Sequence, residues 1–185
     1  MHTNGSFSRT AFETALTPSQ VTIAQIITGA LLMGVLMFAL VVFYMYEQAV
    51  PGSPGAAEID TIRTMTFVHL FFLVVNVGVG WFLAQRIFSP QSVAAAVGTE
   101  DTAALSARLV MQQRSAMIIR LAVMEGAAFF GLVICLLGSM NGVLRVMPEY
   151  WINLLSPFLL VAYGIATFPS RERLVSWFEE RFLTA

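Results

Sequence analysis

The chain carries no charged residue from position 14 to position 46, between Glu13 and Glu47. About 20 apolar residues are enough for one helix to cross the roughly 30 Å hydrocarbon layer of a bilayer. Only 11% of the chain is Asp, Glu, Lys or Arg, whereas soluble domains contain about 25%. The charged residues are also segregated into short segments between long neutral runs. This pattern predicts an all-α integral membrane protein.

Four transmembrane helices are predicted, at about 21–46, 64–88, 115–138 and 150–168. The first begins at Thr17-Pro18-Ser19-Gln20, which has the pattern of a capping box with proline at the first helical position. The second is stopped by Ser89-Pro90, and the fourth contains Pro157. From Glu100 the pattern is already helical, so the third helix is expected to start outside the membrane.

The four helices are predicted to form two hairpins. Residues 1–16 form a polar N-terminal segment, 17–98 the first two-helix unit, 99–169 the second, and 170–185 a tail. In the tail, four apolar side chains share one side of a helix: Leu174, Trp177, Phe178 and Phe182. Such a segment is typical of an amphipathic helix that lies in the membrane interface.

The two hairpins show an internal repeat. Aligning AQIITGALLMGVLMFALVVF, which begins at Ala24, with AMIIRLAVMEGAAFFGLVIC, which begins at Ala116, gives eight identities in twenty positions without a gap. A duplicated unit with an even number of spans predicts parallel repeats, related by an axis along the membrane normal.

Small residues recur at matching positions of the repeat, as Ala30 and Gly34 in the first span and Ala122 and Gly126 in the third. Small residues four apart allow two membrane helices to approach closely. Helices one and three are therefore predicted to pack together or against neighbouring subunits. The alternative is that these small residues are present only because small residues are common in membrane helices.

The arginines predict the orientation, because positively charged residues gather on the cytoplasmic side. Arg63 and Arg145 lie at helix ends on the opposite side. Both termini and the second connection are thus expected in the cytoplasm, and the protein in a bacterial inner (plasma) membrane. Most arginines flank that connection or lie in the tail: Arg86, Arg108, Arg114, Arg120, Arg171, Arg173 and Arg181.

Several functions are not expected. A net charge of −1 with scattered arginines gives no basic face for nucleic acid. Cys135 is the single cysteine, so one chain can form neither a disulfide nor a thiolate metal cluster. No catalytic triad, metal cluster or paired-carboxylate site is recognisable. We expect neither an enzyme nor a cofactor; the expected partners are the bilayer and a second copy or other membrane subunits.

Glu125 is the most informative residue because it lies about midway along the third predicted span. A charge at that depth costs roughly 2.5–3.5 kcal/mol on insertion scales, so such groups usually face protein or water. A carboxyl group there can hold a helix–helix hydrogen bond in its neutral form, or it can release a proton and take up a proton or cation as the carboxylate. Asn76, near the middle of the second span, is the expected partner at similar depth. The repeat partner of Glu125 is Met33, so one hairpin lacks the acid.

His69 lies in the second span, nearer to Arg63. It is predicted to be a hydrogen-bonded interfacial histidine, with proton relay toward Glu125 as the functional alternative. Ligation of a porphyrin metal is disfavoured because no second histidine lies in a predicted span.

The segment Gln113-Arg114-Ser115 followed by AMIIRLAVMEGAAFFGLVICLL resembles the carboxylate-bearing helix of the rotor-ring proteolipids (subunit c/K type) of rotary ATPases. The resemblance covers about 25 residues. It implies that Glu125 binds the transported ion, and that a duplicated hairpin can lack the acid in one copy, as at Met33. The chain departs from the family in two ways: the acid is on the first helix of its hairpin, and the dense glycine ladder is missing. The chain also resembles uncharacterised small bacterial four-span proteins, which implies no activity.

Three functional hypotheses follow. The first is an oligomeric membrane protein that handles a proton or cation through Glu125, with Asn76 and His69 as further candidates. The second is a non-catalytic scaffold or accessory subunit of a larger membrane complex. The third is a small solute transporter, which would need a dimer or larger ring to enclose a pathway.

Overall fold

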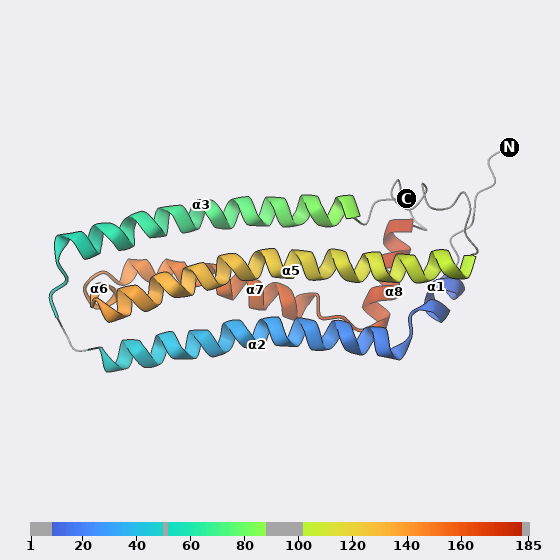
Figure 1. Cartoon of the computed structure of the whole chain (residues 1–185), viewed down its shortest axis with the longest axis horizontal. Coiled ribbons are helices and arrows are strands. Elements are labelled where there is room, and N and C mark those ends of the chain that lie inside the picture. The colour runs from blue at the N-terminus through green and yellow to red at the C-terminus, as the bar shows by residue number, and fades with distance from the viewer. Residues whose placement is uncertain (1–8, 50–51, 88–101, 183–185) are drawn as a thin grey trace. The chain divides into compact units, whose positions relative to one another are not determined.

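The computed structural model describes residues 9–49, 52–87 and 102–182, and these residues are helical with short connections (Figure 1). No strand occurs in these ranges. The prediction of an all-α protein is confirmed for this part of the chain. In chain order the elements are α1 (Arg9–Ala15), α2 (Pro18–Gln48), α3 (Ala56–Ile87), α5 (Thr102–Met140), α6 (Val143–Val146), the 3₁₀ helix η1 (Pro148–Leu154), α7 (Leu155–Ala166) and α8 (Arg171–Phe182).

Among the described residues, three helices are long and apolar enough to cross a membrane: Pro18–Gln48, Ala56–Leu83 and Leu105–Met140. A fourth is reached only if the broken pair Pro148–Ala166 and Arg171–Glu180 counts as one span. The protein therefore has three to four candidate membrane helices. The fourth predicted span, 150–168, is interrupted by a change of helix type between η1 and α7.

The ends of the helices follow local signals. The capping box forms as predicted: the Thr17 amide donates to Gln20 Oε1 at 3.1 Å, and the Gln20 amide donates to Thr17 Oγ1 at 3.4 Å. Helix α5, with 39 residues, begins at Thr102, well before the predicted span at 115–138. Helix α3 begins at Ala56, eight residues before the predicted span at 64–88. A hydropathy window detects the segment that is apolar enough to lie in lipid. It does not detect the polar turns at the ends of the same helix.

The chain divides into two compact units. Unit 1 comprises Met1–Thr28, Trp81–Arg120 and Thr167–Ala185. Its core includes Phe12 of α1 and Phe178 of α8, whose rings stack with centroids 4.2 Å apart. Leu174 and Phe178 of α8 are 8% and 1% exposed. The apolar side of the tail helix thus packs against protein in unit 1, while its position in a membrane interface stays a prediction. Predicted Phe182 ends α8, and its side chain lies outside the described residues.

Unit 2 comprises Gly29–Gly80 and Leu121–Ala166. It contains the greater part of α2, α3 and α5, together with α6, η1 and α7. Gly142 joins α5 to α6 with a φ of 74°, a left-handed conformation that glycine adopts without steric cost. This unit contains Glu125, Asn76 and His69.

Candidate functional site

Glu125 lies on α5 as a half-buried side chain. A Cβ atom placed on Gly34 of α2 would lie 4.0 Å from Glu125 Oε1 and 3.8 Å from Phe129, so the carboxylate faces α2 at this glycine. No hydrogen bond or ion pair from residues 9–49, 52–87 or 102–182 reaches Glu125. The carboxylate therefore lies beside apolar side chains without a donor from the described chain.

Asn76 is not joined to Glu125. Its Nδ2 donates to the Phe72 carbonyl one turn earlier on α3 at 2.8 Å. Such a bond satisfies the amide locally and ties it to its own helix. Within the part of the chain that the structure describes, no hydrogen bond joins Asn76 or His69 to Glu125.

His69 is fully buried, with 0% of its surface exposed. Its Nδ1 lies 2.8 Å from Asn153 Oδ1 of η1, and its Nε2 lies 2.8 Å from Ser156 Oγ of α7. Both ring nitrogens are thus hydrogen-bonded to residues more than 80 positions away in sequence. Buried polar groups need such partners, because an unpaired one costs about 1–3 kcal/mol. We call these residues and those that complete their bonds the His69 cluster: Thr66, His69, Ala127, Tyr150, Asn153 and Ser156.

The remaining polar atoms of the cluster are also paired. Asn153 Nδ2 donates to Thr66 Oγ1 at 2.9 Å and to the Tyr150 carbonyl at 2.8 Å. Ser156 Oγ lies 3.0 Å from the Ala127 carbonyl, to which it can donate. Asn153 and Ser156 are 0% and 1% exposed. The cluster therefore links α3, α5, η1 and α7 through side chains that are closed off from solvent.

Pro157 explains why the cluster forms at the junction of η1 and α7. Proline has no amide hydrogen, so the carbonyl of Asn153, four residues earlier, loses its helical donor. Ser156 Oγ lies 3.4 Å from that carbonyl and partly replaces the missing donor. The interruption coincides with the change from 3₁₀ to α-helix between Leu154 and Leu155. Irregular backbone at membrane depth is tolerated where protein buries it.

Gly131 of α5 allows the close approach of η1 and α7. A Cβ atom at this position would collide with the Asn153 carbonyl oxygen, and it would lie 2.7 Å from Ser156 Oγ and 2.9 Å from His69 Cε1. A backbone carbonyl oxygen cannot move away from such a contact, whereas the end of a flexible side chain could. Gly131 is thus required by the packing of the His69 cluster.

The four predicted packing residues are only partly engaged. Gly34 faces Phe129 and Glu125 of α5, and the Phe38 and Phe129 rings lie 5.7 Å apart. Helices α2 and α5 therefore approach each other in unit 2. In contrast, Ala30, Ala122 and Gly126 are exposed, and a Cβ atom at Gly126 would meet nothing within 4 Å.

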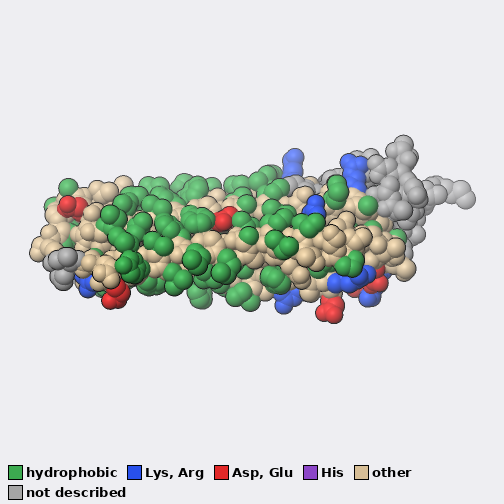
Figure 2. Space-filling view, turned by 60° about the horizontal axis from the view of Figure 1, so that its bottom comes forward, with side chains coloured by type: hydrophobic (Ala, Val, Ile, Leu, Met, Phe, Trp, Pro, Cys, Tyr) green, Lys and Arg blue, Asp and Glu red, His purple; other side chains and the backbone are tan. Residues whose placement is uncertain are grey.

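Hydrophobic side chains are spread along the face drawn in Figure 2, with backbone and other side chains between them. On α3, Phe71 and Val74 are 72% and 73% exposed. Scattered apolar residues are normal on a soluble protein, but long apolar faces mark contact with lipid or with another protein.

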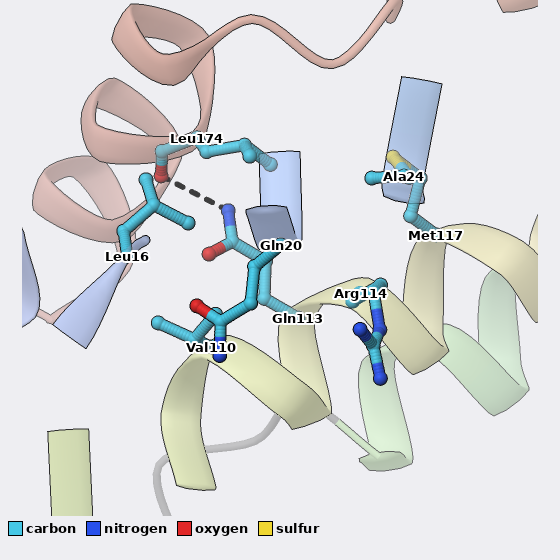
Figure 3. A pocket seen from close by; sticks show the side chains of 8 residues that line it. All are labelled: Leu16, Gln20, Ala24, Val110, Gln113, Arg114, Met117 and Leu174. Atoms are coloured by element: carbon cyan, nitrogen blue, oxygen red, sulfur yellow. Dashed lines mark hydrogen bonds between the residues drawn. The ribbon is translucent and has the colours of Figure 1, made fainter. Parts of the chain in front are cut away.

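The cavity in Figure 3 belongs to unit 1 and has a volume of about 10 Å³, room for about one water molecule. Gln113 is 2% exposed and its Nε2 donates to the Leu174 carbonyl at 3.0 Å, so α5 is tied to α8 beside the cavity. The cavity is too small for any ligand larger than water. It is lined by Leu16, Gln20, Ala24, Val110, Gln113, Arg114, Met117 and Leu174.

A larger cleft of about 320 Å³ lies between α1 and α8. Arg9 forms ion pairs there with Glu13 at 2.6 Å and Glu179 at 2.7 Å. The hydrogen bond to Glu13, with the charge of Glu179, raises the pKa of Arg9 above its ordinary value. These pairs are largely exposed, where ion pairs contribute little to stability.

Among the residues that the structure describes, no three His, Cys, Asp or Glu side chains gather as a metal ion would require. No protein-family model, no curated protein and no solved structure matches the chain. Inference about function therefore rests on the geometry of the residues above.

Three members of the His69 cluster were missed in the sequence: Thr66, Asn153 and Ser156. The first lies one turn before His69 on the same helix, and the other two lie within the four residues before Pro157 in a predicted span. Polar residues beside a proline in an apolar segment were the available signal.

Proposed function

We propose that this chain is an integral membrane protein that handles a proton or cation through Glu125. The observation that carries the proposal is the isolation of its carboxylate: it sits on an apolar helix without a hydrogen-bond donor from the described chain. A carboxyl group kept only to hold two helices of one chain together would have its partner within that chain. Placing such a group among apolar side chains is costly, and function is the usual reason to retain it.

The neighbourhood of Glu125 suits a small, exchangeable ligand. Gly34 leaves space beside the carboxylate, and Gly126 next to it carries no side chain. A proton needs only the carboxylate oxygens. A cation would need further oxygen ligands, which a second copy of the chain would supply across the exposed Ala122 and Gly126. The resemblance to rotor-ring proteolipids points to the same role for Glu125.

The proposal includes a topology. Segment 148–166 is the fourth crossing, both termini are cytoplasmic, and the membrane is a bacterial inner membrane. The two hairpins are parallel repeats. In support, the aligned residues Ala24 and Ala116 are 2% and 1% exposed, as expected if the duplicated helices keep corresponding buried positions. The protein acts as an oligomer and catalyses no chemical reaction.

The test is ion flux in proteoliposomes. The wild type, Glu125→Gln and the control Glu149→Gln, whose side chain is exposed at the start of η1, are reconstituted at equal density after their oligomeric sizes have been compared. We expect a proton or sodium flux in the wild type and the control, and its loss in Glu125→Gln with unchanged assembly. Equal flux in all three proteins would contradict the proposal.

A scaffold or accessory subunit is the second candidate. It is favoured by the exposure of Ala30, Ala122 and Gly126, because small residues on an open helix face suit another membrane helix. On this hypothesis none of the three proteins conducts, and Glu125→Gln dissociates from its complex or oligomer. The same reconstitution thus separates the two candidates.

A further inference from the structure

The orientation of the Asn153 side chain decides which atoms of His69 carry hydrogen. The Tyr150 carbonyl lies 2.8 Å from Asn153 Nδ2, and a carbonyl only accepts, so the amide nitrogen must face it. The amide oxygen therefore faces His69 Nδ1 at 2.8 Å. Because that oxygen also only accepts, Nδ1 must donate. His69 thus carries a hydrogen on Nδ1 in every state of the cluster.

Ser156 has one hydroxyl hydrogen and three acceptors within reach, of which the Asn153 carbonyl at 3.4 Å is the most distant. Nε2 of His69 lies 2.8 Å from its Oγ, and the Ala127 carbonyl lies 3.0 Å from it. When the imidazole is neutral, Nε2 is an acceptor and Ser156 donates to it. When Nε2 is protonated, it donates to Ser156 Oγ, and the hydroxyl hydrogen turns to Ala127. All bonds of the ring are satisfied in both states.

We propose that His69 is a second proton-binding site of this protein, which takes up one proton at Nε2 through rotation of the Ser156 hydroxyl hydrogen. The proton comes from water, where a hydronium ion is its source, and returns there on release. The uptake forms one N–H bond at Nε2 and breaks one O–H bond of the hydronium ion. The two protonation states share the same heavy-atom positions, but the cluster is closed off from solvent, so the packing around His69 must open transiently for the proton to enter or leave. The inference is independent of Glu125 and does not rest on the transport proposal.

The positive charge of the protonated imidazole is stabilised by hydrogen-bond dipoles rather than by an ionised group. On α5 the ring contacts Gly131 and the Phe130 ring, 5.7 Å between centroids, and Cys135 follows one turn later. The titratable groups on η1 are Glu149, whose side chain is exposed, and Tyr150, which hydrogen-bonds Arg63 of α3. The Glu125 carboxylate faces Gly34 of α2 instead. Among the described residues, no carboxylate or guanidinium group contacts the imidazole. Hydrogen bonds to the charged form must stabilise it.

The experiment uses the full chain with ¹⁵N-labelled histidine in lipid bilayers. The chain has two histidines, His2 and His69, so His2→Gln leaves a single labelled ring. Nitrogen-15 spectra distinguish a protonated from an unprotonated ring nitrogen. At pH 8 we expect His69 protonated on Nδ1 alone. On acidification to pH 4 both nitrogens should become protonated, reversibly and without a change in helix content.

Ser156→Ala tests the hydroxyl, with Ser139→Ala as the matched control. Ser139 is also buried, but its Oγ donates to the Cys135 carbonyl on its own helix at 2.7 Å. Ser156 Oγ bonds Nε2 in both protonation states, so the variant removes only the extra strength of the bond to the charged ring, about 1 kcal/mol. We therefore expect the ratio of doubly to singly protonated His69 at fixed pH to fall about fivefold in Ser156→Ala and to stay unchanged in the control.

Three results would overturn the inference. His69 could stay singly protonated down to pH 4 in the wild type, could carry its hydrogen on Nε2 at pH 8, or could respond equally to both serine variants. The first two are read from the wild-type ring and do not require any serine variant to fold. Loss of flux in Glu125→Gln, with or without His69 titration, reports on the other site alone.

Discussion

His69 and Glu125 both place an ionisable group on an apolar helix of unit 2, yet their surroundings are opposite. The imidazole is fully buried and bonded at both nitrogens, whereas the carboxylate is half-buried and receives no donor from the described chain. At His69, the absence of a side chain on Gly131 of α5 lets the backbone of η1 approach closely. At Glu125, the adjacent Gly126 faces open space. A satisfied polar group fixes how helices of one chain pack, and an unsatisfied one indicates a partner from outside the chain.

The largest expected effect is that of Gly131→Ala. Its Cβ atom would strike the Asn153 carbonyl, and overpacking of this kind costs about 3 kcal/mol. Gly126→Ala adds the same atom to open space and replaces glycine by a better helix former, so it should be neutral or stabilising by up to about 1 kcal/mol. Unfolding by sodium dodecyl sulfate, followed by circular dichroism, measures both. Equal midpoints would show that the close approach at Gly131 does not exist.

Asn153→Ala should follow, at about 2 kcal/mol. It removes the acceptor of His69 Nδ1 and the donor to Thr66 and leaves a small cavity, while hydrogen bonds in membrane proteins contribute about 0.6–1.7 kcal/mol each. Asn76→Ala breaks only a bond to the carbonyl of its own helix and should change the free energy of unfolding by less than about 0.5 kcal/mol. Similar losses in the same unfolding assay would mean that Asn153 contributes no more than an amide on a single helix.

Thr66→Val should cost about 1 kcal/mol, because the shape is kept while one hydrogen of the Asn153 amide loses its acceptor. Thr61→Val is the control: this exposed threonine donates to the Ala57 carbonyl of its own turn. The unfolding midpoint should shift only for Thr66. A shift for both would attribute the effect to helix propensity instead.

The smallest effect on stability is expected for Glu125→Leu. No bond within the described chain is lost, and an apolar side chain removes the cost of placing a carboxyl among apolar groups. The free energy of unfolding should stay within about 0.5 kcal/mol or rise, in contrast to every variant of the His69 cluster. A loss of about 2 kcal/mol would place Glu125 in the same structural class as Asn153.

The sequence predicted the helices better than the site. Long apolar runs with at most one charged residue located α2, α3 and α5. The reciprocal bonds of Thr17 and Gln20 were predicted because a capping box is formed by residues three positions apart. These features depend on local pattern. The start of α3 at Ala56 could not be predicted from hydropathy. Glu58 and Asp60 are compatible with a helix, but their charge places them outside the apolar segment that a hydropathy window detects.

The His69 cluster required tertiary information. Asn153 and His69 are 84 residues apart, and Ser156 and Ala127 are 29 apart, so no local pattern pairs them. The expected pairing of Glu125 with Asn76 used depth along the helices alone, and depth does not specify which way a side chain points. Two residues at the same depth do not contact each other when their side chains point toward different neighbours.

The 39 residues of α5 correspond to a rod about 58 Å long at 1.5 Å per residue, nearly twice the hydrocarbon thickness of a bilayer. If α5 crosses a membrane, a large part of it stands in water or headgroups. The two parts of this helix are then stabilised differently as temperature changes. Apolar surface withdrawn from water carries a large heat-capacity change on unfolding, whereas surface exchanged between protein and lipid does not contact water in either state. If unit 2 is the part of the chain within the membrane, the unit 1 core around Phe12 and Phe178 should weaken on cooling, while the His69 cluster should not.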